Sequence, residues 1–200
     1  MVDLCLTLPR EYEVQIIPDE LLSTVPPERT RCFSRENNSR LTSSILMFVE
    51  PTEGAPWYGV FAEEYGVPPA ISRVLSSPWP SRICVVAGGS GFLVDTKDPK
   101  RYTTLSLFPI TGIVQLPGLN ALAFSNLTDA LAINDKEQMW STGRLASDYV
   151  RLLSAQGDFI TATGWDAPSQ RTFPFTIRSK DGIVHKEARY DHPDMRFERS

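Results

Sequence analysis

Short runs that alternate between hydrophobic and polar residues recur along most of the chain. Residues 2–8 and 12–17 alternate with a period of about two, which is the spacing of a strand with one buried face. Residues 44–49 are almost continuously apolar, as in a strand that is buried on both faces. Further strands are predicted at residues 57–62, 83–87, 92–95, 103–107, 111–116, 122–124, 130–133, 150–153, 159–163, 173–177 and 183–185. The pattern therefore predicts a mainly β protein.

Two segments have a helical pattern, and two others have the composition of hairpin turns. Pro18 and the acidic residues after it predict one helical turn, and the apolar spacing within residues 70–75 predicts a second short helix. Gly88-Gly89-Ser90-Gly91 joins two β-rich runs, and Asp181-Gly182 precedes another. Both segments predict hairpin turns. No Lys-Ser/Thr pair follows the glycines, so a phosphate-binding loop is not expected there.

The expected fold is one β-rich domain over residues 1–200. It would be a single antiparallel β-sandwich, barrel or small propeller-like meander with one or two short helices. Residues 83–95 and 122–134 echo each other weakly, with the period near 40 that a propeller blade requires, but a meander in a sandwich or barrel gives the same alternation and is preferred. Residues 23–40, which are polar and contain four arginines, are predicted to form an exposed loop or arm. Residues 186–200 form a charge-mixed tail.

Composition narrows the class of protein. The chain has 200 residues, of which 42% are hydrophobic and 22% are charged, as in a soluble globular protein. Its net charge of -4 does not favour a nucleic-acid partner. No secretory signal or membrane-spanning apolar run is present, so we expect a cytoplasmic protein that does not bind membranes. The three cysteines are irregularly spaced and are expected to be free thiols.

Few residues have the spacing of a catalytic or metal site. His185 and His192, with Asp191 and Asp194, have suitable ligand chemistry, but a seven-residue offset between the histidines has no ready geometry on a strand or helix. We therefore predict no metal and no cofactor. Arg144 and Asp148 would share one face of either a helix or a strand and are expected to form a structural ion pair.

Tryptophans and acidic residues supply the remaining candidates. If Arg144 and Asp148 lay in a cleft, the carboxylate could act as an acid or base and the guanidinium as an anion clamp. Aromatic side chains can also line a binding groove, so the candidate binding residues are Trp57, Trp140, Trp165 and Asp166. In a small β protein, tryptophans more commonly pack in the core, with each indole N–H bonded to a partner.

Residues 139–150, 164–166 and 174–178 carry a resemblance to a group of uncharacterised bacterial β-rich proteins. The comparable stretch of that group reads Trp-x-Ser-x-Arg-Leu-x-Trp-Asp-Gly-Leu, followed by Gly-x-Trp-Asp or Gly-x-Ala-Trp-Asn and then by Pro-Phe-x-x-Asp. Residues 84–95 are similar to another segment of the same group, so the resemblance covers roughly residues 46–187. This chain has Ser147, Tyr149 and Arg178 where the group is expected to have Trp, Gly and Asp. The resemblance implies a bacterial protein and implies no activity.

Two functions follow from these observations. The first is a non-catalytic binding or protein-interaction module that neutralises or escorts another protein. The alternative is a hydrolase-like enzyme with a cleft near Trp140, Arg144, Asp148 and Trp165. An enzyme would bring Asp148 and another titratable side chain together in a pocket, whereas a binding protein would show an exposed apolar or aromatic patch. The pattern does not predict the oligomeric state.

Overall fold

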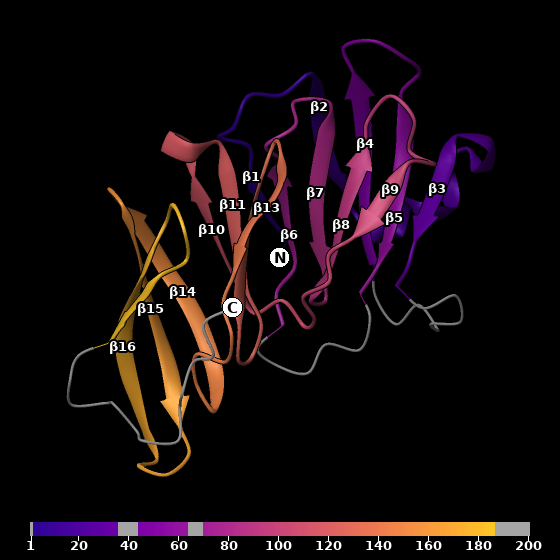
Figure 1. Ribbon diagram of the computed structural model, residues 1–200. Coiled ribbons are helices and arrows are strands. Elements are labelled where there is room, and N and C mark those ends of the chain that lie inside the picture. The colour runs from indigo at the N-terminus through magenta and orange to yellow at the C-terminus, as the bar shows by residue number, and fades with distance from the viewer. Residues whose placement is uncertain (1, 36–43, 64–69, 187–200) are drawn as a thin grey trace. The chain divides into compact units, whose positions relative to one another are not determined.

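The computed structural model describes residues 2–35, 44–63 and 70–186 (Figure 1). The protein is mainly β, as predicted: 55% is strand, the described residues contain no α-helix, and the strands form four open, mostly antiparallel sheets. The chain divides into two compact units, Met1–Ile110 and Thr111–Ser200, each with two sheets. Among the described residues, no helix has the length and apolar character needed to cross a bilayer.

The first unit is a sandwich of two sheets. One sheet has the order β1 (Asp3–Cys5), β6 (Arg73–Ser76), β7 (Arg82–Ala87), β8 (Ser90–Asp95), β9 (Tyr102–Thr104). The other has the order β2 (Tyr12–Ile17), β4 (Ser44–Pro51), β5 (Trp57–Ala62), β3 (Thr30–Phe33). Pairs β1–β6 and β3–β5 are parallel and the others antiparallel. Phe33 and Phe61 stack with ring centroids 4.3 Å apart, and Phe92 of the facing sheet lies 5.6 Å from Phe61. Apolar side chains of both sheets therefore form one core.

Parts of the first unit differ from the expectations. Residues 73–76 form strand β6 and not a helix, because they pair with β1 and β7 and are mostly buried, and such tertiary pairing overrides local helical spacing. Within the predicted arm, Pro27–Arg29 forms a 3-10 helix, and Thr30–Phe33 forms β3 with Phe33 buried. The arm's residues 36–40 lie outside the described residues. The predicted helical turn after Pro18 is a 3-10 helix, Asp19–Thr24.

The second unit pairs two meandering antiparallel sheets. The first contains β10 (Gly112–Leu116), β11 (Ala121–Ser125), β12 (Ala130–Asn134) and β13 (Glu137–Ser141), with the 3-10 helix Pro117–Leu119 between β10 and β11. The second contains β14 (Asp148–Gln156), β15 (Phe159–Asp166), β16 (Arg171–Arg178) and β17 (Val184–Lys186). The pattern does not predict β13, because its first two residues are exposed and polar.

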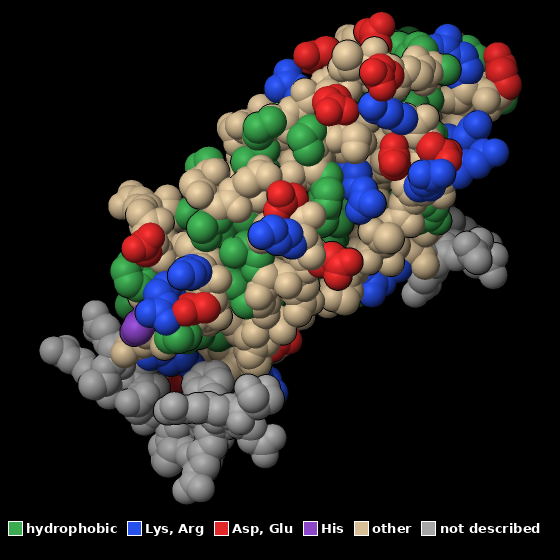
Figure 2. Space-filling view, turned by 45° about the horizontal axis from the view of Figure 1, so that its top comes forward, with side chains coloured by type: hydrophobic (Ala, Val, Ile, Leu, Met, Phe, Trp, Pro, Cys, Tyr) green, Lys and Arg blue, Asp and Glu red, His purple; other side chains and the backbone are tan. Residues whose placement is uncertain are grey.

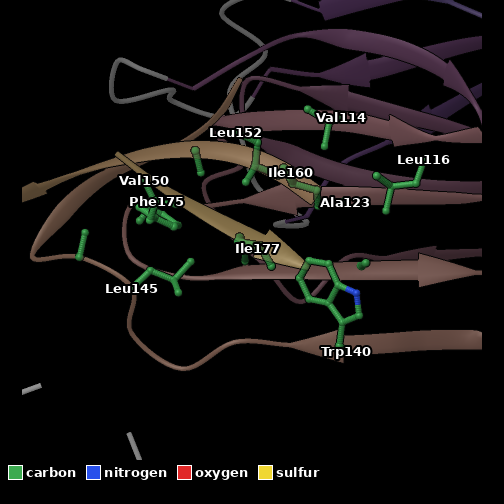
Figure 3. Packing of buried hydrophobic residues seen from close by; sticks show 14 of the residues in the cluster. Val114, Leu116, Ala123, Trp140, Leu145, Val150, Leu152, Ile160, Phe175 and Ile177 are labelled. Carbon is green, nitrogen blue, oxygen red and sulfur yellow. The ribbon is translucent and has the colours of Figure 1, made fainter. Parts of the chain in front are cut away.

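Small side chains on one sheet face large ones on the other in the core of the second unit. Alanines of β11 and β12 point into this core, and Phe173, Phe175 and Ile177 of β16 fill the space that they leave. Figure 3 shows Trp140, Ile160 and Ile177 among the side chains between the two sheets. This packing explains why the alternating pattern of β15 and β16 is so regular, since every second residue is buried.

Both predicted hairpins are present, β7–β8 with a two-residue turn and β16–β17 with residues 179–183, which include Asp181-Gly182, between its strands. Gly88 and Gly89 separate β7 from β8 and have φ values of 51° and 84°, the left-handed pair that a tight hairpin needs. The predicted hairpin turn at these glycines is therefore confirmed. Residues 83–95 and 122–134, which echo each other in sequence, form the hairpins β7–β8 and β11–β12 of two different sheets.

One hydrogen bond recurs in the two units and joins the two sheets of each. The indole N–H of Trp57 in β5 donates to the carbonyl oxygen of Thr96, which follows β8, at 2.8 Å. The indole N–H of Trp140 in β13 donates to the carbonyl oxygen of Ser179, which follows β16, also at 2.8 Å. Donor and acceptor are 39 residues apart in both units. Each core is therefore closed by a buried tryptophan in the same way.

Candidate binding face on the β14–β17 sheet

The β14–β17 sheet exposes one complete face. Residues of β15 and β16 alternate between buried and exposed or half-buried, whereas β8 and β11 are buried at nearly every position. We call the side opposite the core the outer face. Strand register places on it Asp148, Arg151, Ser154 and Gln156 of β14; Phe159, Thr161, Thr163 and Trp165 of β15; Thr172, Pro174, Thr176 and Arg178 of β16; and His185 of β17. Leu153 lies in a bulge of β14 between Leu152 and Ser154 and is exposed.

Strand register places these side chains in rows across the sheet. Thr161 is paired with Thr176, which is paired with His185. The His185 ring meets the Phe159 ring edge to face, with centroids 5.9 Å apart. A depression of about 270 Å³ is lined by Thr161, Pro174, Phe175, Thr176, His185 and Lys186. The outer face is thus shallow, built of short threonine side chains between larger aromatic ones.

Large apolar side chains on this face are exposed to solvent. Leu153 is 53% exposed and Phe159 is 43% exposed, while Trp165 is half-buried. Scattered exposed apolar residues are common, but several on one sheet face can mark a contact surface. Leu153 and Phe159 are not among the site residues predicted from the sequence. The signal for Phe159 is its place in the period-two pattern of β15, where it faces away from the core.

Basic charge accompanies these apolar residues. From Arg144 to Lys186 the chain has six Lys and Arg residues against four Asp, although the whole chain carries a net charge of -4. Arg151 and Arg171 are exposed and form no ion pair or side-chain hydrogen bond with the described residues. Figure 2 shows the described histidine, in purple, beside Lys and Arg side chains in blue. The positive charge here is therefore not cancelled within the described chain.

Acidic side chains of the sheet are mostly occupied by local partners. The Asp166 carboxylate accepts hydrogen bonds from the backbone N–H of Ser169 at 3.0 Å and from its hydroxyl at 2.6 Å. Asp181 binds the Arg178 guanidinium, and this hydrogen bond lowers the pKa of its carboxyl. Asp166 is buried and shapes the turn between β15 and β16, so it is not available as a binding residue.

Trp57 and Trp140 lie in the two cores. Both are nearly fully buried, and their indole N–H groups are bonded to backbone carbonyls as described above. Neither can line a surface groove in this fold, so of the tryptophans predicted as binding residues only Trp165 contributes to the outer face. The core role that is usual for tryptophan in small β proteins accounts for the other two.

Arg144 and Asp148 do not form the predicted ion pair. The guanidinium of Arg144 donates to the carbonyl oxygens of Ala146 at 3.1 Å and of Ser147 at 2.9 Å. The carboxylate of Asp148 accepts the backbone N–H of Tyr149 at 2.8 Å. Backbone groups thus replace the expected partner of each side chain. Neither residue lines the depression on the outer face.

Gly164 allows β15 to lie close to Ala146, which a larger residue at position 164 would prevent. A methyl group added at Gly164 would lie 2.5 Å from the Cβ of Ala146, which is far inside van der Waals contact. Ala146 is fully buried and precedes β14. The segment Gly164-Trp165-Asp166 therefore combines a close-packed glycine, an outward-facing tryptophan and a turn-shaping aspartate.

Tyr149 has a backbone conformation that tyrosine rarely adopts. Its φ is 54°, in the left-handed region, which costs an L-residue with a bulky side chain roughly 1–2 kcal/mol. Asp148 and Arg151 are three residues apart, but their partners Trp165 and Thr163 are two apart, so β14 contains a bulge here. Glycine, which adopts this conformation without cost, is the residue expected at this position from the resemblance.

Metal-binding groups do not converge in the described chain. Among the described residues, no group of three or more His, Cys, Asp and Glu side chains could hold a metal ion. His192, Asp191 and Asp194 lie outside the described residues, so the four-residue cluster considered from the sequence cannot be placed. Of the thiols, Cys32 is exposed and Cys84 is buried, and neither forms a disulfide.

A second depression lies elsewhere in the second unit. It has a volume of about 260 Å³ and lies at the β10–β11 and β14–β15 turns, where its lining includes Leu116, Leu119 and Gly157. The described residues that line it include no titratable side chain.

The chain shows no significant match to a protein-family model, to a curated protein or to a solved structure. The exposed apolar groups of the outer face, next to the unpaired guanidinium of Arg151, have the chemistry of a recognition surface.

Proposed function

We propose that this chain is a non-catalytic protein-binding module, and that the outer face of the β14–β17 sheet docks an acidic surface of a partner protein. One observation carries the proposal: exposed Phe159 lies on the same sheet face as the unpaired guanidinium of Arg151, and exposed Leu153 lies beside it in the bulge of β14. Apolar and aromatic groups supply the energy of most protein interfaces, and arginine is enriched among the residues that dominate binding.

Charge favours an acidic partner. Arg151 has no carboxylate paired with it among the described residues, whereas most carboxylates of this sheet already accept hydrogen bonds. A partner with Asp and Glu around an apolar centre would complement this face and would be steered toward it. A nucleic acid would also bring negative charge, but the overall charge of -4 would oppose its long-range approach.

The size of the face sets the expected strength of the complex. A strand of eight residues is about 27 Å long, and four strands are about 19 Å wide, so the flat area is about 500 Å². A stable interface typically buries about 800 Å² on each partner. We therefore expect a weak or transient complex unless neighbouring loops contribute. A protein that neutralises or escorts its target in the cytoplasm would act through such a contact.

The hydrolase alternative has less support. It requires Arg144 and Asp148 to act together, but their side chains bind separate backbone groups. Trp140, the third residue of that cleft, is buried in the core. No single observation in the described residues favours this function over binding.

Photo-crosslinking in the native host is a suitable test, because a covalent bond captures a transient complex. The photoreactive analogue p-benzoyl-phenylalanine replaces Phe159, which conserves an aromatic ring at that position. The matched control carries the same analogue at Tyr102 in β9, since Phe159 and Tyr102 are both 43% exposed. We expect a specific adduct from position 159 and none from position 102.

The identity of the crosslinked molecule tests the proposal. Mass spectrometry should identify a protein with an acidic surface, and the purified partner should bind the purified chain. Charge reversal by Arg151→Glu, or about 0.5 M salt, should reduce the adduct several-fold because both weaken the attraction between opposite charges. No adduct at position 159, equal adducts at both positions, or a nucleic-acid adduct would refute the proposal. An adduct with a second copy of this chain would refute the acidic partner and indicate self-association.

A further inference from the structure

Tyr149 has an unfavourable backbone and no specific side-chain interaction that offsets it. Its side chain is 55% exposed, and it forms no hydrogen bond, ion pair or aromatic ring contact with the described residues. Within the described part of the chain, four residues other than glycine have positive φ: Asn120, Glu137, Tyr149 and Gln170. The other three adjoin turns at strand ends, whereas Tyr149 lies inside the bulge of β14. Strain of this kind tends to be retained at functional sites.

Neighbouring hydrogen bonds hold the bulge in place. The backbone N–H of Tyr149 donates to Asp148 Oδ1 at 2.8 Å, and that of Val150 donates to the carbonyl oxygen of Leu127 at 2.9 Å. Val150 is buried in the core. Hydrogen bonds therefore hold the backbone at Tyr149 and Val150, and the exposed aromatic side chain projects from this bulge.

We infer that Tyr149 is a specificity-determining contact for the acidic protein partner. The inference rests on the proposed function, because it places Tyr149 in the same docking surface as Arg151. Tyr149 shares the bulge with Asp148, whose register partner is Trp165 of the outer face. A tyrosine buries much area at little entropic cost, and its hydroxyl can donate to a carboxylate of the partner. The unpaired Arg151, two residues away, supplies the opposite charge for the same carboxylates.

A substitution that removes the backbone strain at position 149 distinguishes a role of Tyr149 in binding from a role in stability. Tyr149→Gly removes the side chain and suits a φ of 54°, so the urea midpoint of unfolding should not fall. Binding should fall about tenfold, as when a dominant interface tyrosine is truncated. Tyr149→Phe keeps the ring and removes only the hydroxyl, so it should lose part of this affinity. Gln170→Gly is the matched control, since Gln170 is exposed with a φ of 51° in the turn before β16. It should keep full binding.

Each variant is made in the full chain that carries the photoreactive analogue at position 159, and adduct yield and unfolding are both measured. Loss of adduct in Tyr149→Gly with an unchanged or raised urea midpoint supports the inference. An unchanged adduct yield overturns it and leaves the proposed function standing. A lowered midpoint in Tyr149→Gly overturns it too, because Tyr149 would then stabilise the fold. If the parent chain gives no adduct, the proposed function and this inference both fail.

Discussion

The close contact between Gly164 and Ala146 gives a sharp test of the core packing in the second unit. In the substitution Gly164→Ala, the new methyl carbon would lie 2.5 Å from the Cβ of Ala146, while the Phe173 and Phe175 rings, at 3.4 Å, are near ordinary contact. The clash is therefore almost entirely with one methyl group. Relief requires β15 or the Ala146 segment to move by about 1 Å, because two carbon atoms prefer a separation of about 3.5–4.0 Å.

The expected losses in the free energy of unfolding follow from this contact geometry. Overpacking of a well-packed core costs about 1–3 kcal/mol, so Gly164→Ala should lower the free energy of unfolding by about 2 kcal/mol. Ala146→Gly should cost about 1.5 kcal/mol, since it removes a fully buried methyl group and adds backbone freedom to the unfolded chain. The double variant moves the methyl group from one side of the contact to the other. It should lose only about 1 kcal/mol, well below the additive loss of about 3.5 kcal/mol.

Urea unfolding followed by circular dichroism measures these four free energies. Gly143→Ala is the control, because a methyl group there would meet no atom within 4 Å. It should change the stability by less than about 0.5 kcal/mol. Additive losses in the double variant, or a Gly164→Ala variant as stable as the parent, would refute the contact between Gly164 and Ala146.

Three further predictions concern buried groups. Trp57→Phe and Trp140→Phe each leave a buried carbonyl without its donor, so each should lower the free energy of unfolding by about 1–3 kcal/mol in urea titrations; a neutral effect of both would contradict a structural role for the indole bonds. Burial raises the pKa of the Cys84 thiol to about 12, so this thiol loses its proton at lower pH in the unfolded chain than in the folded chain. The free energy of unfolding should therefore fall between about pH 9 and 12, by up to about 1.4 kcal/mol per pH unit. Cys84→Ala should show a shallower decline over this range, and an identical slope would argue against it. In the folded chain, an aromatic disulfide reagent should label exposed Cys32 quickly and Cys84 only on unfolding, and rapid labelling of Cys84 would contradict its burial.

The alternation of hydrophobic and polar residues predicted most of the strands, because it shows which side chains of a strand can be buried on one face. The predicted strands at 12–17 and 57–62 coincide with β2 and β5. The predicted glycine turn at residues 88–89 connects β7 to β8. The pattern failed where partners outside the segment decide the outcome. Residues 73–76 have helical spacing but become a strand through their pairing with β1 and β7.

The candidate site shows the same division. Composition marked tryptophans, Arg144 and Asp148 as unusual, but it could not tell which of them face solvent. Trp140 and Trp165 are both tryptophans of the second unit, yet the first closes a core and the second lies on the outer face. Leu153 and Phe159, which carry the proposed interface, look like ordinary strand residues until the sheet shows that they point away from its core.

By itself, the sequence determined that this protein is built of short antiparallel strands with tight turns, since alternation and turn residues are local properties of the chain. Tertiary structure alone decided the division into two units, the left-handed backbone of Tyr149 and the exposure of one face of the β14–β17 sheet. The physical reason is that burial, charge pairing and backbone strain depend on residues that are distant along the chain and meet only after folding.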